Sequence, residues 1–136
     1  MTGRALVATV CVAFLTIAPV VGHHLITEVY DVRRTTTIEG SIAGIVLKNP
    51  HTFVHLSVAG DEGRMRTWAI ELEGATKLQQ QGIGRRTFDI GDRLLVCGNP
   101  GRDASEYRLL MLQLTRPADG FAVSRHVEES EAVCSD

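Results

Sequence analysis

The sequence lacks an excess of positive charge and is poor in aromatic residues. Lysine and arginine number 14 against 16 aspartate and glutamate residues, and the net charge is −2. The aromatic residues are four phenylalanines, two tyrosines and one tryptophan. Proteins that bind nucleic acid through its phosphates present a basic face. We therefore expect no nucleic-acid partner.

Recognisable catalytic patterns are also missing. The sequence has no nucleophile elbow with a Ser-His-Asp order, no phosphate-binding loop and no evident pair of catalytic carboxylates. It has no repeat of solenoid or propeller spacing. With 136 residues, 44% of them hydrophobic, the chain is long enough for one packed domain. We predict a single-domain protein that is not an enzyme.

A long apolar run occurs at the N-terminus, at residues 5–21, directly after Arg4. One positive charge, an apolar stretch and small residues at its end are typical of a secretory signal peptide. The alternative is a membrane anchor, but about 17 residues is the lower limit for a spanning helix, and Pro19 interrupts the run. We predict a signal helix at 1–22, a periplasmic or secreted protein, and membrane contact only before cleavage.

The predicted cleavage site lies beside two histidines, His23 and His24. Cleavage after Gly22 makes His23 the first residue, so that its α-amine and imidazole can chelate one metal ion. Cleavage one residue earlier exposes Gly22-His23-His24, which offers a square of nitrogens after deprotonation of backbone amides. Tetragonal nitrogen sites favour Cu(II) or Ni(II). A solvated, unstructured pair of histidines is the alternative.

The remainder of the chain predicts β-strands. Runs rich in β-branched residues, separated by glycine and proline, indicate strands at 35–47, 52–58, 64–72, 94–98 and 107–114. A short helix is expected at 75–81, between the third and fourth strands. Residues 26–32 are expected to be an extended lead-in. This order of elements is that of an OB-like barrel, which we assign to 23–116, with a flexible C-terminal tail at 117–136.

Alternation along the second strand places His51 and His55 on one face and Val54 and Leu56 on the core face. Glu71 lies on the neighbouring third strand, either orienting a ligating histidine or pairing with an arginine such as Arg66. Trp68 is expected to belong to the core.

Three cysteines are present, and Cys11 lies within the apolar leader. The remaining pair, Cys97 and Cys134, is expected to form a disulfide in an oxidising compartment. Two free thiols, one buried and one on the mobile tail, are the alternative.

Several short motifs occur in a characteristic order. They are His23-His24, Asn49-Pro50-His51, the Trp-x-x-Glu motif of Trp68 to Glu71, Gly91-Asp92, and a strand that ends at Gly98. In this order the chain resembles an uncharacterised family of small secreted bacterial proteins that carry a His-His mature N-terminus and an Asn-Pro-His motif. The resemblance departs at Leu25, where serine is expected, and in the position of the aromatic after His51. It implies export and an OB-like fold, and it implies no activity.

Imidazole suits copper, zinc and nickel, which makes His23, His24, His51 and His55 the candidate ligands of a metal site with copper as first choice. Against this, the sequence has no HxxxH or CxxC spacing. The alternative is that His51 caps the turn before the second strand and His55 is a half-exposed strand residue. In that case the barrel face or a sheet edge binds a small ligand or a protein partner.

Overall fold

The computed structural model describes residues 26–128 and 130–134, and the predicted signal helix lies outside them. The elements follow in the order α1 (Ile26–Val29), β1 (Thr36–Val46), β2 (His51–Ala59), η1 (Asp61–Gly63), β3 (Met65–Glu73), α2 (Ala75–Gln80), β4 (Arg93–Pro100), η2 (Ala104–Glu106), β5 (Arg108–Arg116) and β6 (Phe121–Ser124). Among the described helices none is both long and apolar enough to cross a membrane.

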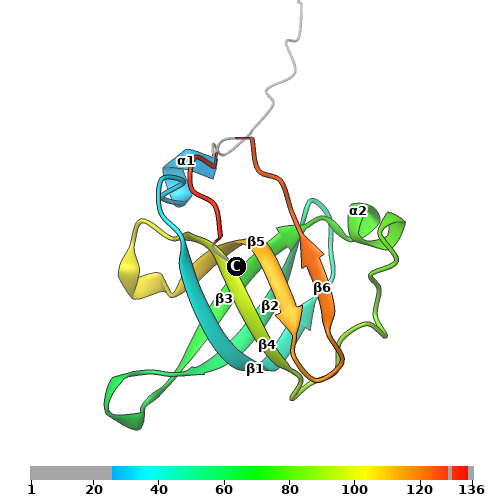
Figure 1. Cartoon of the computed structure of the whole chain (residues 1–136), viewed down its shortest axis with the longest axis horizontal. Helices are drawn as coiled ribbons and strands as arrows, with labels where there is room; N and C mark the ends of the chain where they lie inside the picture. Colours follow the sequence, from blue (N-terminus) through cyan, green and yellow to red (C-terminus); the bar gives the residue numbers. More distant parts are fainter. Residues whose placement is uncertain (1–25, 129, 135–136) are drawn as a thin grey trace, which may run out of the picture.

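Five of the strands close into a barrel (Figure 1). The sheet order is β3-β2-β1-β4-β5-β6, and a parallel pairing of β3 with β5 joins the two ends of the five-stranded part. All other pairings are antiparallel. The prediction of a mainly β protein, with a five-stranded barrel and one short helix between the third and fourth strands, is confirmed.

The barrel interior is filled by aliphatic side chains from alternate strand positions. On β2, Val54 and Leu56 are 1% and 0% exposed, whereas the alternate residues Phe53, His55 and Ser57 are only half-buried. The interior cluster draws on every barrel strand, on α2 and on the loop that follows it; its buried members are Ile38, Ile42, Val54, Leu56, Ile70, Leu72, Leu78, Ile83, Phe88, Leu94, Val96, Leu109, Met111 and Leu114. The outer face of β2 and β3 is therefore free to carry polar residues.

β1 bends sharply so that one strand can pair with both neighbours. Its first half pairs with β4 and its second half with β2, and the register shifts between Ile42 and Gly44. At Gly40 a Cβ would lie 2.6 Å from the carbonyl oxygen of Ser57, closer than real Cβ contacts allow. Glycine at this position permits the close approach of β1 to β2 at the barrel corner, as the sequence indicated.

A second layer covers the outside of β4 and β5. Tyr30, Leu110, Leu112 and Val127 form a buried cluster there, against which Ile26, Val29 and Cys134 pack. We expected residues 26–32 to be extended, but they begin with the short helix α1, whose apolar side chains cover this cluster.

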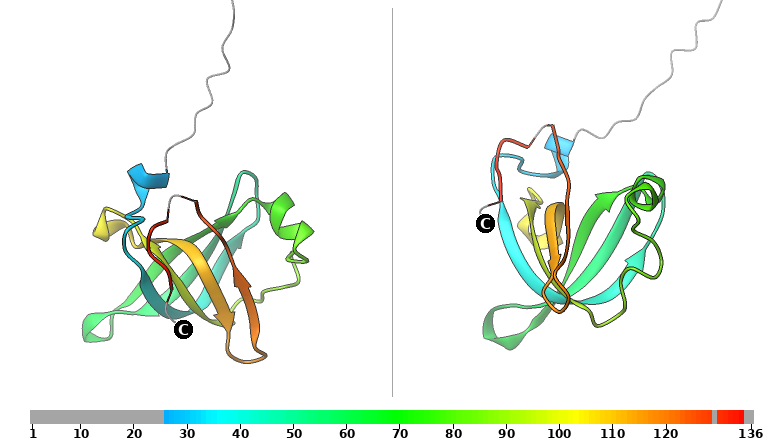
Figure 2. Two further views of the ribbon diagram at one scale, coloured as in Figure 1. Left: turned by 45° about the horizontal axis from the view of Figure 1, so that its top comes forward. Right: turned by 45° about the vertical axis from the view of Figure 1, so that its right-hand side comes forward.

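The C-terminal segment differs from the expected flexible tail. Residues 121–124 form β6, which pairs with the second half of β5. Beyond it the backbone of Glu131 and Ala132 donates hydrogen bonds to the carbonyl of Val32, and Cys97 and Cys134 are joined by a disulfide. Figure 2 shows this segment running back across the barrel toward the N-terminal helix. The polar composition suggested a loose tail, but a few apolar residues and the Cys97–Cys134 disulfide attach this segment to the barrel.

Candidate functional site

The turn between β1 and β2 fixes the start of β2 and hence the position of His51. Asn49 accepts a hydrogen bond from the Thr76 backbone N–H (3.1 Å) and donates one to the Thr76 hydroxyl (2.9 Å). The Asn49–Pro50 peptide bond is cis. A Cβ at Gly74 would lie 2.6 Å from the Pro50 carbonyl oxygen. The Asn-Pro step therefore packs against the beginning of α2, which fixes the place at which β2 starts with His51.

His51 contacts a buried carboxylate on the neighbouring strand. Its Nδ1 lies 3.0 Å from Oε1 of Glu71, and the His51 side chain is 45% exposed whereas that of Glu71 is 10% exposed. The Nδ1 atom is buried, and the pair is not aligned as a directed hydrogen bond. Because Nδ1 faces Glu71, Nε2 is the ring nitrogen that is available to a ligand.

The other oxygen of the carboxylate is held by Tyr30. The Tyr30 hydroxyl donates a 2.6 Å hydrogen bond to Oε2 of Glu71. Burial raises the pKa of Tyr30 well above its ordinary value, and the bond to Glu71 raises it further, so the phenol remains a donor. Arg108 completes the group, with its guanidinium 3.9 Å from Oε2 of Glu71 and 5.7 Å from the centre of the Tyr30 ring. Glu71 therefore pairs with Arg108, whereas we had suggested Arg66.

A cavity of about 330 Å³ opens beside this group. Its walls are Ile26, Val29, Tyr30, His51, Phe53, Glu71 and Arg108. One side is therefore apolar, from α1 and Phe53, and the other carries an imidazole, a carboxylate and a guanidinium. Ile26 is also the first described residue, so the chain enters the described part of the fold at the wall of this cavity.

The predicted histidines are only partly brought together. His55 lies on the same face of β2 as His51 but four residues further on, opposite Ala69 and beside Gly44. At about 3.3 Å per residue the two Cα atoms are roughly 13 Å apart, which is too far for parallel side chains to share one ion. His23 and His24 lie outside the described residues. Within residues 26–128 and 130–134 no group of three or more His, Cys, Asp or Glu side chains is suitably placed to hold a metal.

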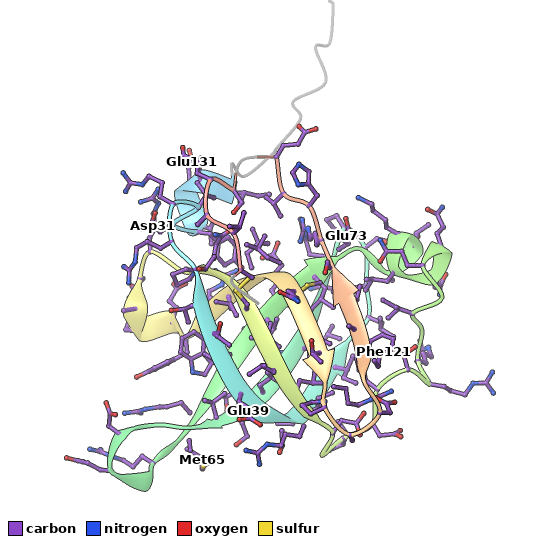
Figure 3. All side chains as sticks on the ribbon, viewed as in Figure 1. Asp31, Glu39, Met65, Glu73, Phe121 and Glu131 are labelled. Atoms are coloured by element: carbon purple, nitrogen blue, oxygen red, sulfur yellow. A yellow bond between two sulfur atoms is a disulfide. The ribbon has the colours of Figure 1, made fainter. Side chains whose placement is uncertain are left out.

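A second buried carboxylate, Glu73, was not predicted. It follows Glu71 by two residues, so both project from the outer face of β3, and it is 8% exposed. Lys77 lies 2.5 Å from Oε1 of Glu73, Gln81 donates to its Oε2 at 3.1 Å, and Arg125 lies 3.9 Å from Oε1. Figure 3 shows Glu73 at the end of β3 near β6. The spacing of two was a signal for a shared face, but the partners come from α2 and the C-terminal segment, whose positions the sequence did not indicate.

A family model described as a family of unknown function, DUF6152, matches residues 9–109. The chain belongs to this family. The match confirms the uncharacterised family that the resemblance implied. The importance of the paired histidines and of the Asn-Pro-His motif, like export, stays a prediction. No curated protein matches this DUF6152 chain. No solved structure matches it either.

Proposed function

We propose that this protein is an exported barrel that binds a transition metal ion, with copper as first choice, at the outer face of β2. In this proposal His51 supplies one ligand, and His23 and His24 supply the others from the chain just before α1. The observation that carries the proposal is the contact of His51 Nδ1 with a buried carboxylate, Glu71.

A carboxylate behind a histidine is a common device in metal sites. It fixes the ring orientation and makes the opposite nitrogen a better ligand. Glu71 lies 3.0 Å from His51 Nδ1, the distance of such a contact although not its alignment, and it is itself held by the Tyr30 hydroxyl. His51 also lines the 330 Å³ cavity. This arrangement favours a metal-binding role for His51 over a purely structural role in capping the turn.

The length of the intervening chain supports the participation of His23 and His24. His23 precedes Ile26 by three residues, which span at most about 10 Å when extended. Ile26 and His51 line the same cavity. In this proposal the imidazoles of His23 and His24 therefore reach His51 from the wall of this cavity, whereas His55 is further along β2.

Export would supply the free N-terminus that chelates the metal, because the signal peptide is removed. Cleavage after Gly22 gives a terminal His23 whose amine and imidazole bind one Cu(II) ion, and His51 then adds a third nitrogen. The Cys97–Cys134 disulfide supports an oxidising compartment. The apolar run at residues 5–21 supports a leader.

The experiment uses protein exported through its own leader, with the mature N-terminus read by intact mass spectrometry. Cu(II) affinity is then measured by competition with a chromophoric chelator. We expect His51→Ala to weaken binding by at least tenfold and His23→Ala to do the same. His55→Ala is the matched control, since it lies on the same strand and face, and it should leave affinity unchanged. Equal affinity in the wild type and the His51→Ala variant would overturn the composite site.

A second candidate is a site for a non-metal ligand or a protein partner. The cavity favours it because three apolar side chains, Ile26, Val29 and Phe53, face a few convergent polar groups, which is the usual make-up of a small-molecule pocket. This candidate predicts binding that persists in EDTA. The test is NMR of metal-free protein with a library of small fragments, in which the Val29 and Phe53 amides should shift. If shifts appear only after copper is added, the second candidate is excluded.

A further inference from the structure

The interior face of β3 changes character toward the β2–β3 hairpin. Ile70 is 0% exposed, Trp68 is half-buried against the core, and Arg66 is exposed, although all three occupy inward-facing positions. The hairpin projects beyond the barrel at this end (Figure 1). The apolar core therefore ends at the Trp68 indole, and Arg66 occupies the next inward-facing position. We call this open end of the barrel, beside the β2–β3 hairpin, the barrel mouth.

The mouth is hollow. A cavity of about 660 Å³ lies between the first residues of β1 and the hairpin, with Trp68 and Tyr107 on its wall. Figure 3 shows Glu39 and Met65 at this end of the molecule. A second hollow of about 150 Å³ adjoins it and shares Trp68 and Tyr107 with it. The combined space is within the range of small-molecule sites, which are common in barrel mouths.

Tyr107 is held in an unusual backbone conformation to reach this place. It has φ 48° and ψ 58°, the left-handed region that a bulky residue occupies at a cost. Its ring meets Trp68 edge to face, with centroids 5.6 Å apart, and the Arg66 guanidinium lies 5.4 Å from its centre. Gly60 leaves room for Arg66, since a Cβ there would lie 3.2 Å from the Arg66 Cγ. Residues held in sparsely populated backbone regions cluster at active sites and ligand clamps.

Some charged side chains at the barrel mouth have a partner of opposite charge and others do not. Glu39 is paired with Arg93 and Glu62 with Arg64. Among the residues that the structure describes, Arg66 has no carboxylate within 4 Å. Of the two arginines that line the 660 Å³ cavity, Arg66 is therefore the one without an acidic partner, and the cavity also carries acidic groups that can accept hydrogen bonds.

We propose that the barrel mouth binds a sugar that carries a carboxylate, independently of the metal site. The half-buried Trp68 indole offers an apolar surface to the sugar ring, and Arg66 pairs with its carboxylate through a planar fork of donors. The neighbouring carboxylates, Glu39, Asp61 and Glu62, accept hydrogen bonds from sugar hydroxyls. A phosphate monoester concentrates up to two negative charges on one group, whereas each carboxylate of a uronic acid carries one charge that the single cation of Arg66 can balance, so we expect a nucleotide to bind more weakly than a uronic acid.

Trp68 is the one tryptophan of the sequence, so its fluorescence reports on the mouth directly. The titration uses the whole exported protein in EDTA. It compares three probes: digalacturonate, the neutral disaccharide galactobiose, and adenosine monophosphate. We expect a saturable change in Trp68 emission with digalacturonate and at least tenfold weaker binding of galactobiose. Adenosine monophosphate should bind more weakly than digalacturonate.

Arg66→Gln should remove the preference for digalacturonate over galactobiose. Arg64→Gln is the matched control on the same hairpin, because Arg64 is already paired with Glu62, and it should keep the preference. Equal binding of the two disaccharides by the wild type, tighter binding of adenosine monophosphate, or no change in emission at about 10 mM digalacturonate would each overturn the proposal. These comparisons need no variant, so they decide the matter even if Arg66→Gln does not fold. The metal proposal is unaffected by any of them, since copper is absent.

Discussion

The disulfide between Cys97 and Cys134 should contribute a large part of the stability of this fold. The two cysteines are 37 residues apart. For a loop of that length the chain-entropy relation gives about 13 cal/mol/K, or about 4 kcal/mol at 25 °C. Cys134→Ser should therefore lower the free energy of unfolding by about 4 kcal/mol, which corresponds to a melting temperature lower by about 15 °C in a domain of this size.

The assay is urea unfolding of wild type and Cys134→Ser, each with and without a thiol reductant. Reductant should destabilise the wild type to the level of the variant and leave the variant itself unchanged. Val133→Ser is the control, because Val133 is 80% exposed and adjacent in the chain, and it should change stability by less than about 0.5 kcal/mol. If the variant and the reductant each cost less than about 1 kcal/mol, the cross-link does not restrict the unfolded chain and the reasoning fails.

Three further predictions concern single side chains. Gly98→Ala should destabilise by more than about 2 kcal/mol in urea unfolding, because its Cβ would lie 2.1 Å from the Leu110 carbonyl oxygen, whereas Gly84→Ala, with nothing within 4 Å, should be nearly neutral. Asn49→Ala should cost about 1–2 kcal/mol in thermal unfolding through its two lost hydrogen bonds to α2, and a loss below about 0.5 kcal/mol would show that the turn does not need them. Burial raises the pKa of Tyr30, so the stability that its neutral phenol contributes is fully present below the unfolded pKa of about 10 and is lost as the pH rises through the folded pKa. Tyr30→Phe should therefore flatten the fall in the urea midpoint above pH 10, and an unchanged alkaline profile would contradict this.

The barrel strands could be predicted from local patterns. Alternation and β-branched runs located all five, and proline and glycine marked their ends. β6 was missed because Phe121 to Ser124 is short and stands in a polar stretch. Its pairing with β5 is a tertiary effect that a single sequence does not display. The helix α1 was missed for a similar reason, since its four residues are β-branched or acidic and gain their place by packing on the outer cluster.

The candidate site was accessible from the sequence only in part. The relation of Glu71 to His51 could be inferred because both lie on adjoining strands with a shared outer face. Tyr30 and Arg108 could not be inferred, since they come from segments far apart in the sequence that meet only when the barrel closes. The barrel mouth was missed because Trp68 follows the core pattern of β3, and nothing local distinguishes a residue at the end of a core from one inside it.

The parallel pairing of β3 with β5 has a consequence for how the protein reaches this fold. The barrel cannot close until a strand near the C-terminal end has been made, because Ala69, Ile70 and Glu71 pair with Arg108, Leu109 and Leu110. Long-range pairings of this kind slow the folding of β proteins. A nascent chain that emerges N-terminus first therefore lacks the barrel-closing partner of β3 until β5 has been made, so the closed barrel forms only late in synthesis.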